Sequence, residues 1–430
     1  MTDEDRNEKP NAGTVFLQEL FGRKPNGEEQ RGRPVSRILR ALVIPALAVI
    51  TGLIFGAIFI ILTTESVYTA FSQSLGAGLA ESWNVVAESY TALFEGAIGS
   101  PSQIIAALQS GDTAAIRRAF NPILESLVQS TPYIFAGLSV ALGFRAGVFN
   151  IGAEGQIFVG ALTATFAGYA IHGLPGFIHL PLALLAGFAG GAAWGYIPGW
   201  LKAKTGGHEV INTIMMNYIA FRLSDWLLTG PMKRPDSFNP VSPVIEQSAW
   251  LPTFFGPPIR FHLGFFIALG MAYLVYWFLF KSTWGFDLRT VGANPSAAKY
   301  AGMNVTKNII LAMTLAGGLA GLAGANEVLG VNHSLAMAFS SGYGFDSIAL
   351  ALLGNSHPAG VVFASLLFGT LRNGATRMQI ATGIPIDIIS ILQAVILAFI
   401  AAPAIIRTIY RLRKPAVDEG ALTVRGWGGD

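Results

Sequence analysis

Long apolar runs recur along the chain from residue 41 to about residue 406, and shorter polar segments separate them. A run of about 20 apolar residues crosses the hydrocarbon core of a bilayer as a helix. The pattern predicts an all-α, polytopic membrane protein with ten spans, some of them short or broken. The spans are expected at 41–62, 131–145, 151–171, 180–200, 208–229, 262–280, 308–330, 340–356, 358–376 and 385–406.

The remaining segments define the expected organisation around a transmembrane domain at 41–406. Residues 1–40 and 407–430 are polar tails. Residues 63–130 mix acidic and aromatic side chains, which favours an extracytoplasmic or interfacial loop. Residues 281–307 form the longest polar stretch between later spans and are expected on the cytoplasmic side.

Lys and Arg support this arrangement. With the N-terminus inside, the inner segments hold nineteen Lys and Arg, whereas the outer segments hold seven. Positive charge gathers on the cytoplasmic side of membrane proteins. Both termini are therefore expected in the cytoplasm, which requires an even number of crossings: ten, or eight with re-entrant segments.

Composition agrees with a membrane protein and excludes several chemistries. Charged residues make up only 12% of the chain and hydrophobic residues 52%, and there is no cysteine. Disulfides, thiolate metal sites and cysteine catalysis are therefore excluded. The histidines at 208 and 333 lack the spacing of metal ligands, and no phosphate-binding glycine loop or catalytic set is present. We expect no metal, no cofactor and no nucleic-acid partner for this chain. Any ATP would be bound by partner subunits.

Two glycine series have helical spacing. Gly187, Gly191, Gly195 and Gly199 share one helix face, and Gly317, Gly321 and Gly324 occur in a later span. Such faces let two helix backbones approach closely. Packing within the chain is the favoured interpretation, and a subunit interface is the alternative.

Polar side chains interrupt the stretch GFRAGVFNIGAEGQIFVGAL at 143–162. An unpaired charge at the bilayer centre costs roughly 2.5 kcal/mol or more, so such residues face protein or a water-filled route. One interpretation is a break between half-helices that lines a polar path. The other is a short inner loop with Arg145 at the interface, while Glu154 and Gln156 point into the bundle.

Two further polar stretches fall in spans. GGHEVINTIMMNYIAFR (206–222) places two asparagines within a span, and GANEVLGVNHS (324–334) ends another, with Asp346 following it. Amides in a membrane need hydrogen-bond partners. The asparagines therefore predict either interhelical hydrogen bonds or contacts to a substrate.

The 281–307 segment contains a short helix signal. Asn294 is a helix cap, Pro295 suits the first turn, and Gly302 suits the end of a helix that runs through Tyr300. A short helix on a cytoplasmic loop predicts a docking site for a soluble partner, although a solvated connector has the same pattern.

Four of these motifs together resemble one family. GFRAGVFNIGAEGQ, GGHEVINTIMMNYIA, TVGANPSAAKYAGMNV and GVVFASLLFGTLRNG are similar to motifs in membrane permeases of ATP-binding-cassette importers. The resemblance covers about 131–405. Within the sugar and branched-chain amino acid permease superfamily, it is greatest to the branch for uptake of nucleosides, purine nucleosides in particular.

The resemblance implies a transport subunit without enzymatic activity of its own, in a bacterial-type plasma membrane. It implies cytosolic cassette ATPases that hydrolyse ATP, a second permease subunit, identical or related, and an extracytoplasmic substrate-binding protein. The implied coupling residues are Asn294, Pro295, Ser296, Ala297, Ala298, Lys299 and Gly302. Serine stands where such loops usually have glutamate, so no charge contact at that position is implied.

The expected substrate is a small polar solute, most specifically a nucleoside. The candidate path-lining residues are Phe144, Phe149, Asn150, Glu154, Gln156, Asn212, Asn217, Asn326, Glu327 and Asp346. The same importer for a sugar or a branched-chain amino acid is an alternative. An ion-coupled carrier that uses Glu154, Glu327 and Asp346 as ion or proton ligands is a second one.

Overall fold

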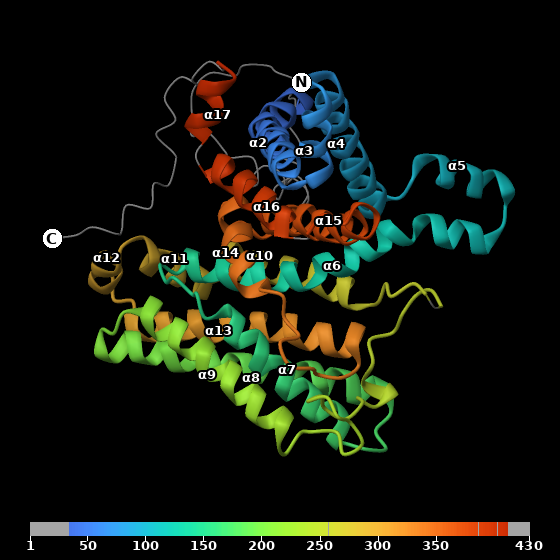
Figure 1. The fold of residues 1–430 in the computed structure, drawn as a ribbon. Coiled ribbons are helices and arrows are strands. Elements are labelled where there is room, and N and C mark those ends of the chain that lie inside the picture. The colour runs from blue at the N-terminus through green and yellow to red at the C-terminus, as the bar shows by residue number, and fades with distance from the viewer. Residues whose placement is uncertain (1–33, 257, 386, 402, 412–430) are drawn as a thin grey trace, which may run out of the picture. The chain divides into compact units, whose positions relative to one another are not determined.

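The computed structural model describes residues 34–411 except 257, 386 and 402. In this part of the chain the regular elements are helices, joined by loops with two isolated β-bridges. The larger helices are α2 (Pro34–Thr63), α4 (Leu75–Ile98), α6 (Thr113–Arg145), α7 (Ala153–Ala170), α8 (Gly176–Thr205), α9 (Glu209–Thr229), α10 (Gly264–Lys281), α13 (Val305–Glu327), α15 (Pro358–Thr382) and α16 (Asp387–Ala401). The shorter ones are α3 (Glu65–Gln73), α5 (Pro101–Ser110), α11 (Thr283–Ala293), α12 (Pro295–Tyr300), α14 (Tyr343–Leu353) and α17 (Pro403–Ile409), shown in Figure 1.

Five helical stretches are long and apolar enough to cross a bilayer: Ala46–Thr63, Thr113–Arg145, Gly176–Thr205, Gly264–Lys281 and Val305–Asn332. Together with shorter apolar helices they confirm an all-α, polytopic membrane protein. Each of the ten predicted spans corresponds to a helix. However, α14 has only 11 residues, about 16 Å at 1.5 Å per residue, so by itself it is too short to cross the hydrocarbon.

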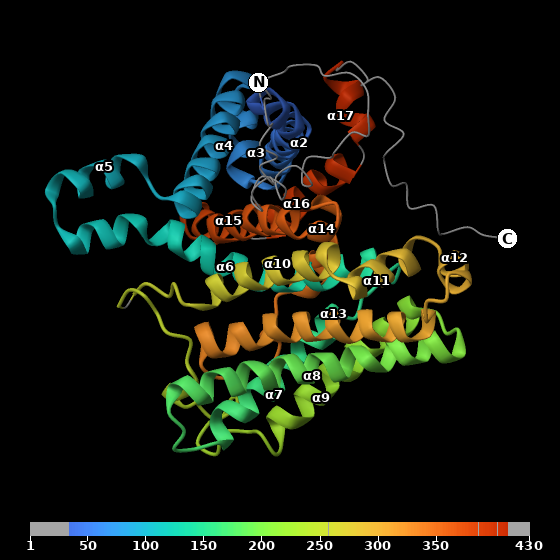
Figure 2. The ribbon, with the colours of Figure 1, turned by 180° about the vertical axis from the view of Figure 1, so that it is seen from behind.

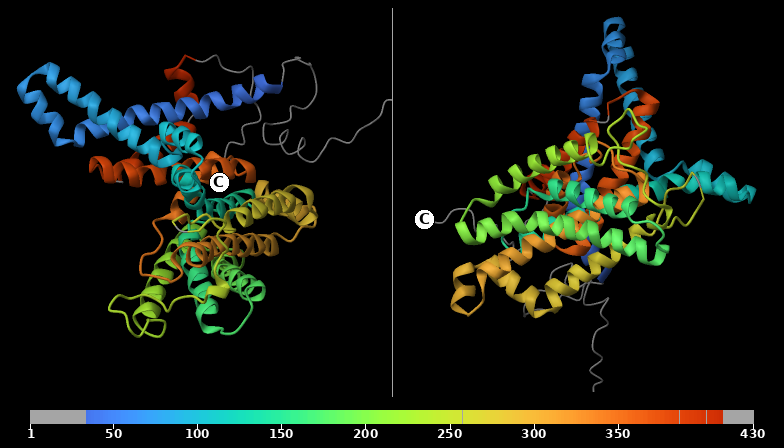
Figure 3. Two further views of the ribbon diagram at one scale, coloured as in Figure 1. Left: turned by 90° about the vertical axis from the view of Figure 1, so that its right-hand side faces the viewer. Right: turned by 90° about the horizontal axis from the view of Figure 1, so that it is seen from below.

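The segment predicted as a loop at 63–130 is helical. It contains α3, α4, α5 and the first half of α6. Buried Leu93 and Gly96 of α4 explain the difference, because Gly96 lies against Gly374 and Arg377 of α15. Figure 3 shows the hairpin of α3 and α4 extending beyond the other helices that pack with it. Its place outside the membrane stays a prediction.

Two compact units make up the chain. The first combines residues up to Phe59 with those from Ser390, and the second spans Ile60–Ile389. In the first unit, the rings of Phe55 and Phe399 are tilted by 46° with centroids 5.8 Å apart, and the hydroxyls of Thr51 and Tyr410 are hydrogen-bonded at 3.0 Å. The predicted N-terminal tail lies outside the described residues up to position 33, and α2 already begins at Pro34. Of the predicted C-terminal tail, 412–430 also lie outside them.

In the second unit, α8 and α13 lie side by side (Figure 1). A side chain could not fit between them, because a Cβ on Gly191 would lie 2.7 Å from the Cα of Gly321 and still closer to the carbonyl oxygen of Gly317. Gly195 meets Gly317 in the same way. The glycine series thus pack against each other within the chain, which confirms the favoured interpretation.

The two ends of α13 carry different structures. Its N-terminus follows α12, and its C-terminus meets the 230–263 loop, where the amides of Leu251 and Ile245 bond the carbonyls of Leu329 and His333. Figure 2 shows α11 leading into α12 at the first of these ends. We call the end of the second unit at α12 the coupling-loop end, and the end at the 230–263 loop the loop end.

Candidate translocation path and coupling loop

The connection between α6 and α7 is a buried turn held by amides. Asn150 and Gln156 bond each other reciprocally, at 2.9 Å from Asn150 Nδ2 to Gln156 Oε1 and 3.2 Å from Gln156 Nε2 to Asn150 Oδ1. Asn150 Oδ1 also accepts from the amide of Gly152 at 3.1 Å. Both side chains are buried. The sequence pattern located this break correctly, and its amides satisfy the backbone where the helix is interrupted.

Asn217 of α9 joins the same break. Its Oδ1 accepts from the amide of Gly155 at 2.8 Å, and its Nδ2 donates to the carbonyl of Ile151 at 3.0 Å. Asn217 therefore makes the interhelical bonds that were one of its two interpretations. Asn212, one turn nearer the helix start, is only half-buried, which leaves it available to a solute.

Glu154 links two helix starts. It lies in the first turn of α7, and its Oε2 accepts from the amide of Gly344 at 2.6 Å, in the first turn of α14. A carboxylate is stabilised at a helix N-terminus by the unsatisfied N–H groups and the helix dipole. A Cβ on Gly344 would lie 2.8 Å from the carbonyl carbon of Ala153. The first turns of α7 and α14 therefore meet closely at Gly344, and the Glu154 carboxylate of α7 bonds the backbone of α14.

Asp346 lies in the same first turn of α14 and has aromatic and cationic neighbours. The Tyr133 hydroxyl donates to its Oδ2 at 3.0 Å, and the Tyr133 and Tyr343 rings pack edge to face with centroids 5.0 Å apart. The Arg372 guanidinium from α15 interacts electrostatically with Asp346 and Tyr133. Ionisable side chains gathered inside a membrane bundle favour a functional site.

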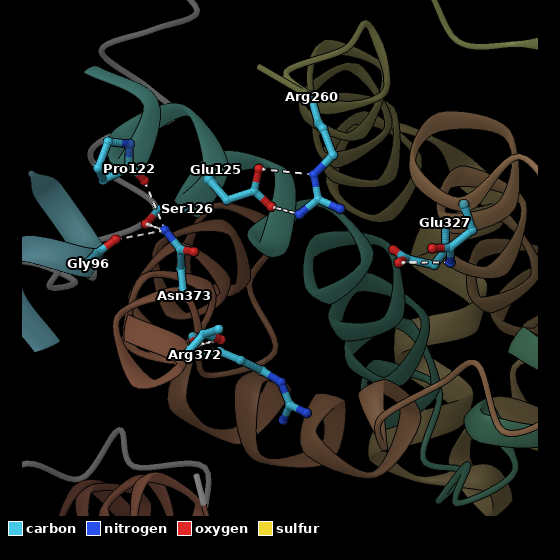
Figure 4. Close-up of polar contacts among 10 residues, drawn as sticks. Gly96, Pro122, Glu125, Ser126, Arg260, Glu327, Arg372 and Asn373 are labelled. Atoms are coloured by element: carbon cyan, nitrogen blue, oxygen red, sulfur yellow. Dashed lines mark hydrogen bonds and ion pairs between the residues drawn. The ribbon is translucent and has the colours of Figure 1, made fainter. Parts of the chain in front are cut away.

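The loop end of the second unit carries a further charged group, shown in Figure 4. The Arg260 guanidinium pairs with both carboxylate oxygens of Glu125, with the Nε bond at 3.3 Å. Glu327 accepts from Asn332 Nδ2 at 3.4 Å and lies within electrostatic range of Arg260. Asn373 of α15 donates to the carbonyl of Gly96 at 2.9 Å. These contacts connect the 230–263 loop to α6, and α15 to α4.

Arg145 and two phenylalanines lie at the opposite end. The rings of Phe144, near the end of α6, and Phe149, in the α6–α7 turn, are tilted by 36° with centroids 5.2 Å apart. Arg145 donates from Nε to the carbonyl of Ser356 at 2.9 Å, and its guanidinium lies 5.5 Å from the centroid of Phe280. Arg145 thus lies at the C-terminal end of α6, and its position relative to the membrane stays a prediction.

The coupling candidates form the short helix that the pattern predicts. Asn294 caps α12 by accepting from the amide of Ala297 at 3.0 Å, Pro295 is the first helical residue, and Gly302 follows with φ +84°. Ser296, Ala297 and Lys299 are exposed, whereas Ala298 is fully buried. Tyr300, which was not singled out from the sequence, is 97% exposed.

Comparison with known proteins decides the family. Residues 122–401 match the model of the branched-chain amino acid transport system/permease component family. The chain belongs to this family. It is 39% identical over 386 residues to a guanosine permease protein of Bacillus subtilis, an alignment that covers 87% of this chain and 98% of that protein. No solved structure matches.

Two other relatives are named for a nucleoside and for glucose. A nucleoside permease protein of Lactococcus lactis is 30% identical over 90% of the chain and 98% of its own length. A glucose permease protein of Haloferax volcanii is 36% identical over 65% of the chain and 75% of its own length. The relatives are transport subunits, and with the apolar helices they establish a multi-pass membrane permease.

The structure brings several candidate residues together. Asn150, Glu154, Gln156 and Asn217 surround the α7 start, and Asp346 lies near them on α14. Asn326 and Glu327 lie at the C-terminal end of α13, and Tyr343 of α14 is within electrostatic range of both Glu327 and Glu154. Tyr133, Tyr343 and Arg372 were missed. Arg372 could have been singled out from the sequence, because it is a charged residue inside the predicted 358–376 span.

Proposed function

We propose that this permease forms the translocation path of an importer for nucleosides, driven by cassette ATPases that separate chains contribute. The choice of a nucleoside as the substrate rests on how much of each relative's length aligns with this chain. The guanosine and nucleoside permease proteins align over 98% of their lengths. The glucose permease protein aligns over 75% of its length.

The side chains around the first turns of α7 and α14 suit a neutral polar solute. Amide, tyrosine and carboxylate groups gather there from α6, α7, α9 and α14, and a cation comes from α15. These groups bond hydroxyls and base edges without requiring a charged solute. The glucose relative supports a sugar as the second candidate, because hydroxyl groups would use the same side chains.

The coupling loop supports the motor assignment. α12 is capped, ends at a glycine and presents polar and aromatic side chains to solvent. We place this loop and both termini in the cytoplasm, where ATPase subunits would receive α12. A binding protein on the opposite side would deliver the solute.

A second, related permease chain is favoured over an identical one. Bacillus subtilis has two guanosine permease proteins that match this chain, one at 39% and the other at 26% identity. Lactococcus lactis likewise has two nucleoside permease proteins, at 30% and 27%. Two matching permeases within each organism suggest a pair of different subunits around one path.

Uptake by the assembled transporter in proteoliposomes tests the proposal. We expect ATP-dependent accumulation of guanosine, with weaker or no uptake of glucose and leucine. Accumulation should persist when ion gradients are collapsed at constant ATP. Uptake that stops with the gradient would support the ion-coupled alternative, and uptake of glucose alone would replace the substrate class.

A further inference from the structure

An open cavity of about 470 Å³ lies at the loop end of the second unit. Its wall includes Gln247, Trp250, Leu251, Arg260, Gly330 and His333. The Trp250 and His333 rings stack with centroids 3.8 Å apart and planes inclined by 14°. Pockets for small molecules range from about 300 to 1,000 Å³ and combine apolar walls with a few polar groups. The cavity therefore has the size and the flat aromatic wall of a small-molecule site.

The backbone beside the cavity departs from regular geometry. α13 continues into a π-helical turn at Val328–Asn332, and His333 follows with φ 51°. π-Helical turns and left-handed non-glycine residues concentrate at functional sites, since each is less stable than the regular alternative. This deviation places His333 in the cavity wall.

Buried polar atoms without partners gather at the same place. Within the described ranges, neither side-chain atom of Asn326 has a hydrogen bond, nor do His262 Nε2 and His333 Nδ1. Asn326 and His262 are each only 1% exposed. An unsatisfied buried polar group costs about 1–3 kcal/mol. Four such atoms together favour a ligand that would bond them.

The side chains that carry these atoms are close neighbours. A Cβ on Gly330 would lie 2.8 Å from His262 Nε2, so no side chain separates that atom from the Gly330 part of the cavity wall. A Cβ on Gly264 would lie 2.8 Å from the His262 ring and would overlap the Asn326 carbonyl oxygen. His262 thus lies directly beside the Gly330 part of the wall, Asn326 lies next to His262, and His333 belongs to the wall itself.

The hydrogen-bonding pattern of this group follows from its existing bonds. His262 Nδ1 accepts from the amide of Gly264 at 3.1 Å, so the proton of the neutral ring is on Nε2, which is a donor. Burial lowers the pKa of His262 to about 4, and the charges of His333 and Arg260 add to this effect. His262 is therefore neutral at physiological pH.

His333 supplies the complementary acceptor. Within the described residues His333 Nδ1 has no hydrogen-bond partner, so it accepts a bond in the neutral tautomer that carries its proton on Nε2. Asn326 adds one donor group and one acceptor. Among the described residues of the wall, the cationic side chain is Arg260, which is paired with Glu125. The group therefore offers alternating donors and acceptors beside an aromatic wall, with little net charge.

We propose that this cavity is an entry site that holds the neutral heteroaromatic base of a nucleoside before it passes to the α7–α14 region. A base has a flat face for the Trp250–His333 wall and donor and acceptor edges for the polar group. A sugar has no flat aromatic face, and a zwitterionic amino acid requires unpaired charges that the wall lacks. The inference rests on the proposed function and adds to it a second site that selects the base.

Two variants of the full transporter test the entry site. Asn326→Leu removes both unpaired amide atoms with little change in size, and Trp250→Leu removes the aromatic wall. Trp83→Leu is the matched control, because Trp83 is a 74% exposed tryptophan on α4 that belongs neither to the cavity wall nor to the coupling loop. The measurements are guanosine affinity of the purified transporter in nanodiscs, KM for ATP-driven guanosine uptake, and the thermal midpoint.

Both cavity variants should weaken guanosine binding and raise KM about tenfold, the effect of one lost hydrogen bond or stacking contact in a buried site. The maximal uptake rate of the cavity variants and the behaviour of Trp83→Leu should stay near wild type. Asn326→Leu should not lower the thermal midpoint, since the amide has no bond to lose. If that variant fails to reach the membrane, Trp250→Leu decides the outcome alone.

Unchanged guanosine affinity and KM in the variants would overturn the entry site. The wild-type measurement separates this failure from that of the proposed function. If wild type imports guanosine and the variants match it, only the entry site is refuted. If wild type imports no nucleoside, the proposed function itself is refuted.

Discussion

Tyr300 offers the sharpest test of the coupling loop. The side chain is 97% exposed at the end of α12, while neighbouring Ala298 is fully buried and anchors the helix. A tyrosine buries about 150–250 Å² when it enters an interface, and such anchors typically contribute at least about 2 kcal/mol to binding. Tyr300→Ala should therefore weaken the permease–ATPase complex about 30-fold. The fold should be unaffected, because almost none of the side chain is covered within the chain.

The assay is titration of the ATPase onto permease in nanodiscs, followed by ATP-driven uptake at limiting and saturating ATPase. Phe238→Ala is the matched control, because Phe238 is a fully exposed aromatic residue in the loop at the other end. Uptake by Tyr300→Ala should recover at saturating ATPase. Equal affinities for wild type and Tyr300→Ala would refute the docking role of this residue, and a loss in Phe238→Ala would show that the effect is not specific to α12.

Three other predictions concern the fold and the path. Gly191→Ala should destabilise the protein by about 1–3 kcal/mol through overpacking, whereas Gly270→Ala should not, because a Cβ on Gly270 meets nothing within 4 Å; thermal midpoints of detergent-solubilised protein check this. Asn217→Leu should lower the thermal midpoint and uptake together, since two backbone groups at the α7 start lose their partner, and a wild-type midpoint would contradict it. His262 has a folded pKa of about 4 against 6.5 when unfolded; the unfolded chain therefore binds more protons between these values, and stability should fall as pH drops from 6.5 to 4. His262→Gln should flatten this dependence.

Much of the fold could be predicted from local pattern. Apolar runs located the spans, because helices in a bilayer must be apolar over most of their length. The Asn294-Pro295 cap and Gly302 located α12, because capping depends on neighbouring residues alone. The segment 63–130 could not be assigned in this way. Its α4 helix carries several acidic residues and is helical through packing of Leu93 and Gly96 against distant helices.

The candidate site was only partly accessible from sequence. Glu154 and Asn217 stood out because polar residues are rare in spans, but their actual partners come from residues 62 to 190 positions away. Tyr133 and Tyr343 are unremarkable in a span until their rings are seen beside Asp346. The group around His262 needs a loop to fold back on α13, which no periodicity reports.

The most direct test of the central claim uses the absence of cysteine from the chain. A single cysteine at Ser296, on the exposed face of α12, should crosslink in intact cells to a nucleotide-hydrolysing polypeptide, and the yield should change when ATP is depleted. A cysteine at Phe238 should not reach that polypeptide. Absence of any ATPase adduct at Ser296, or equal yield from both positions, would contradict the account of a permease driven through α12.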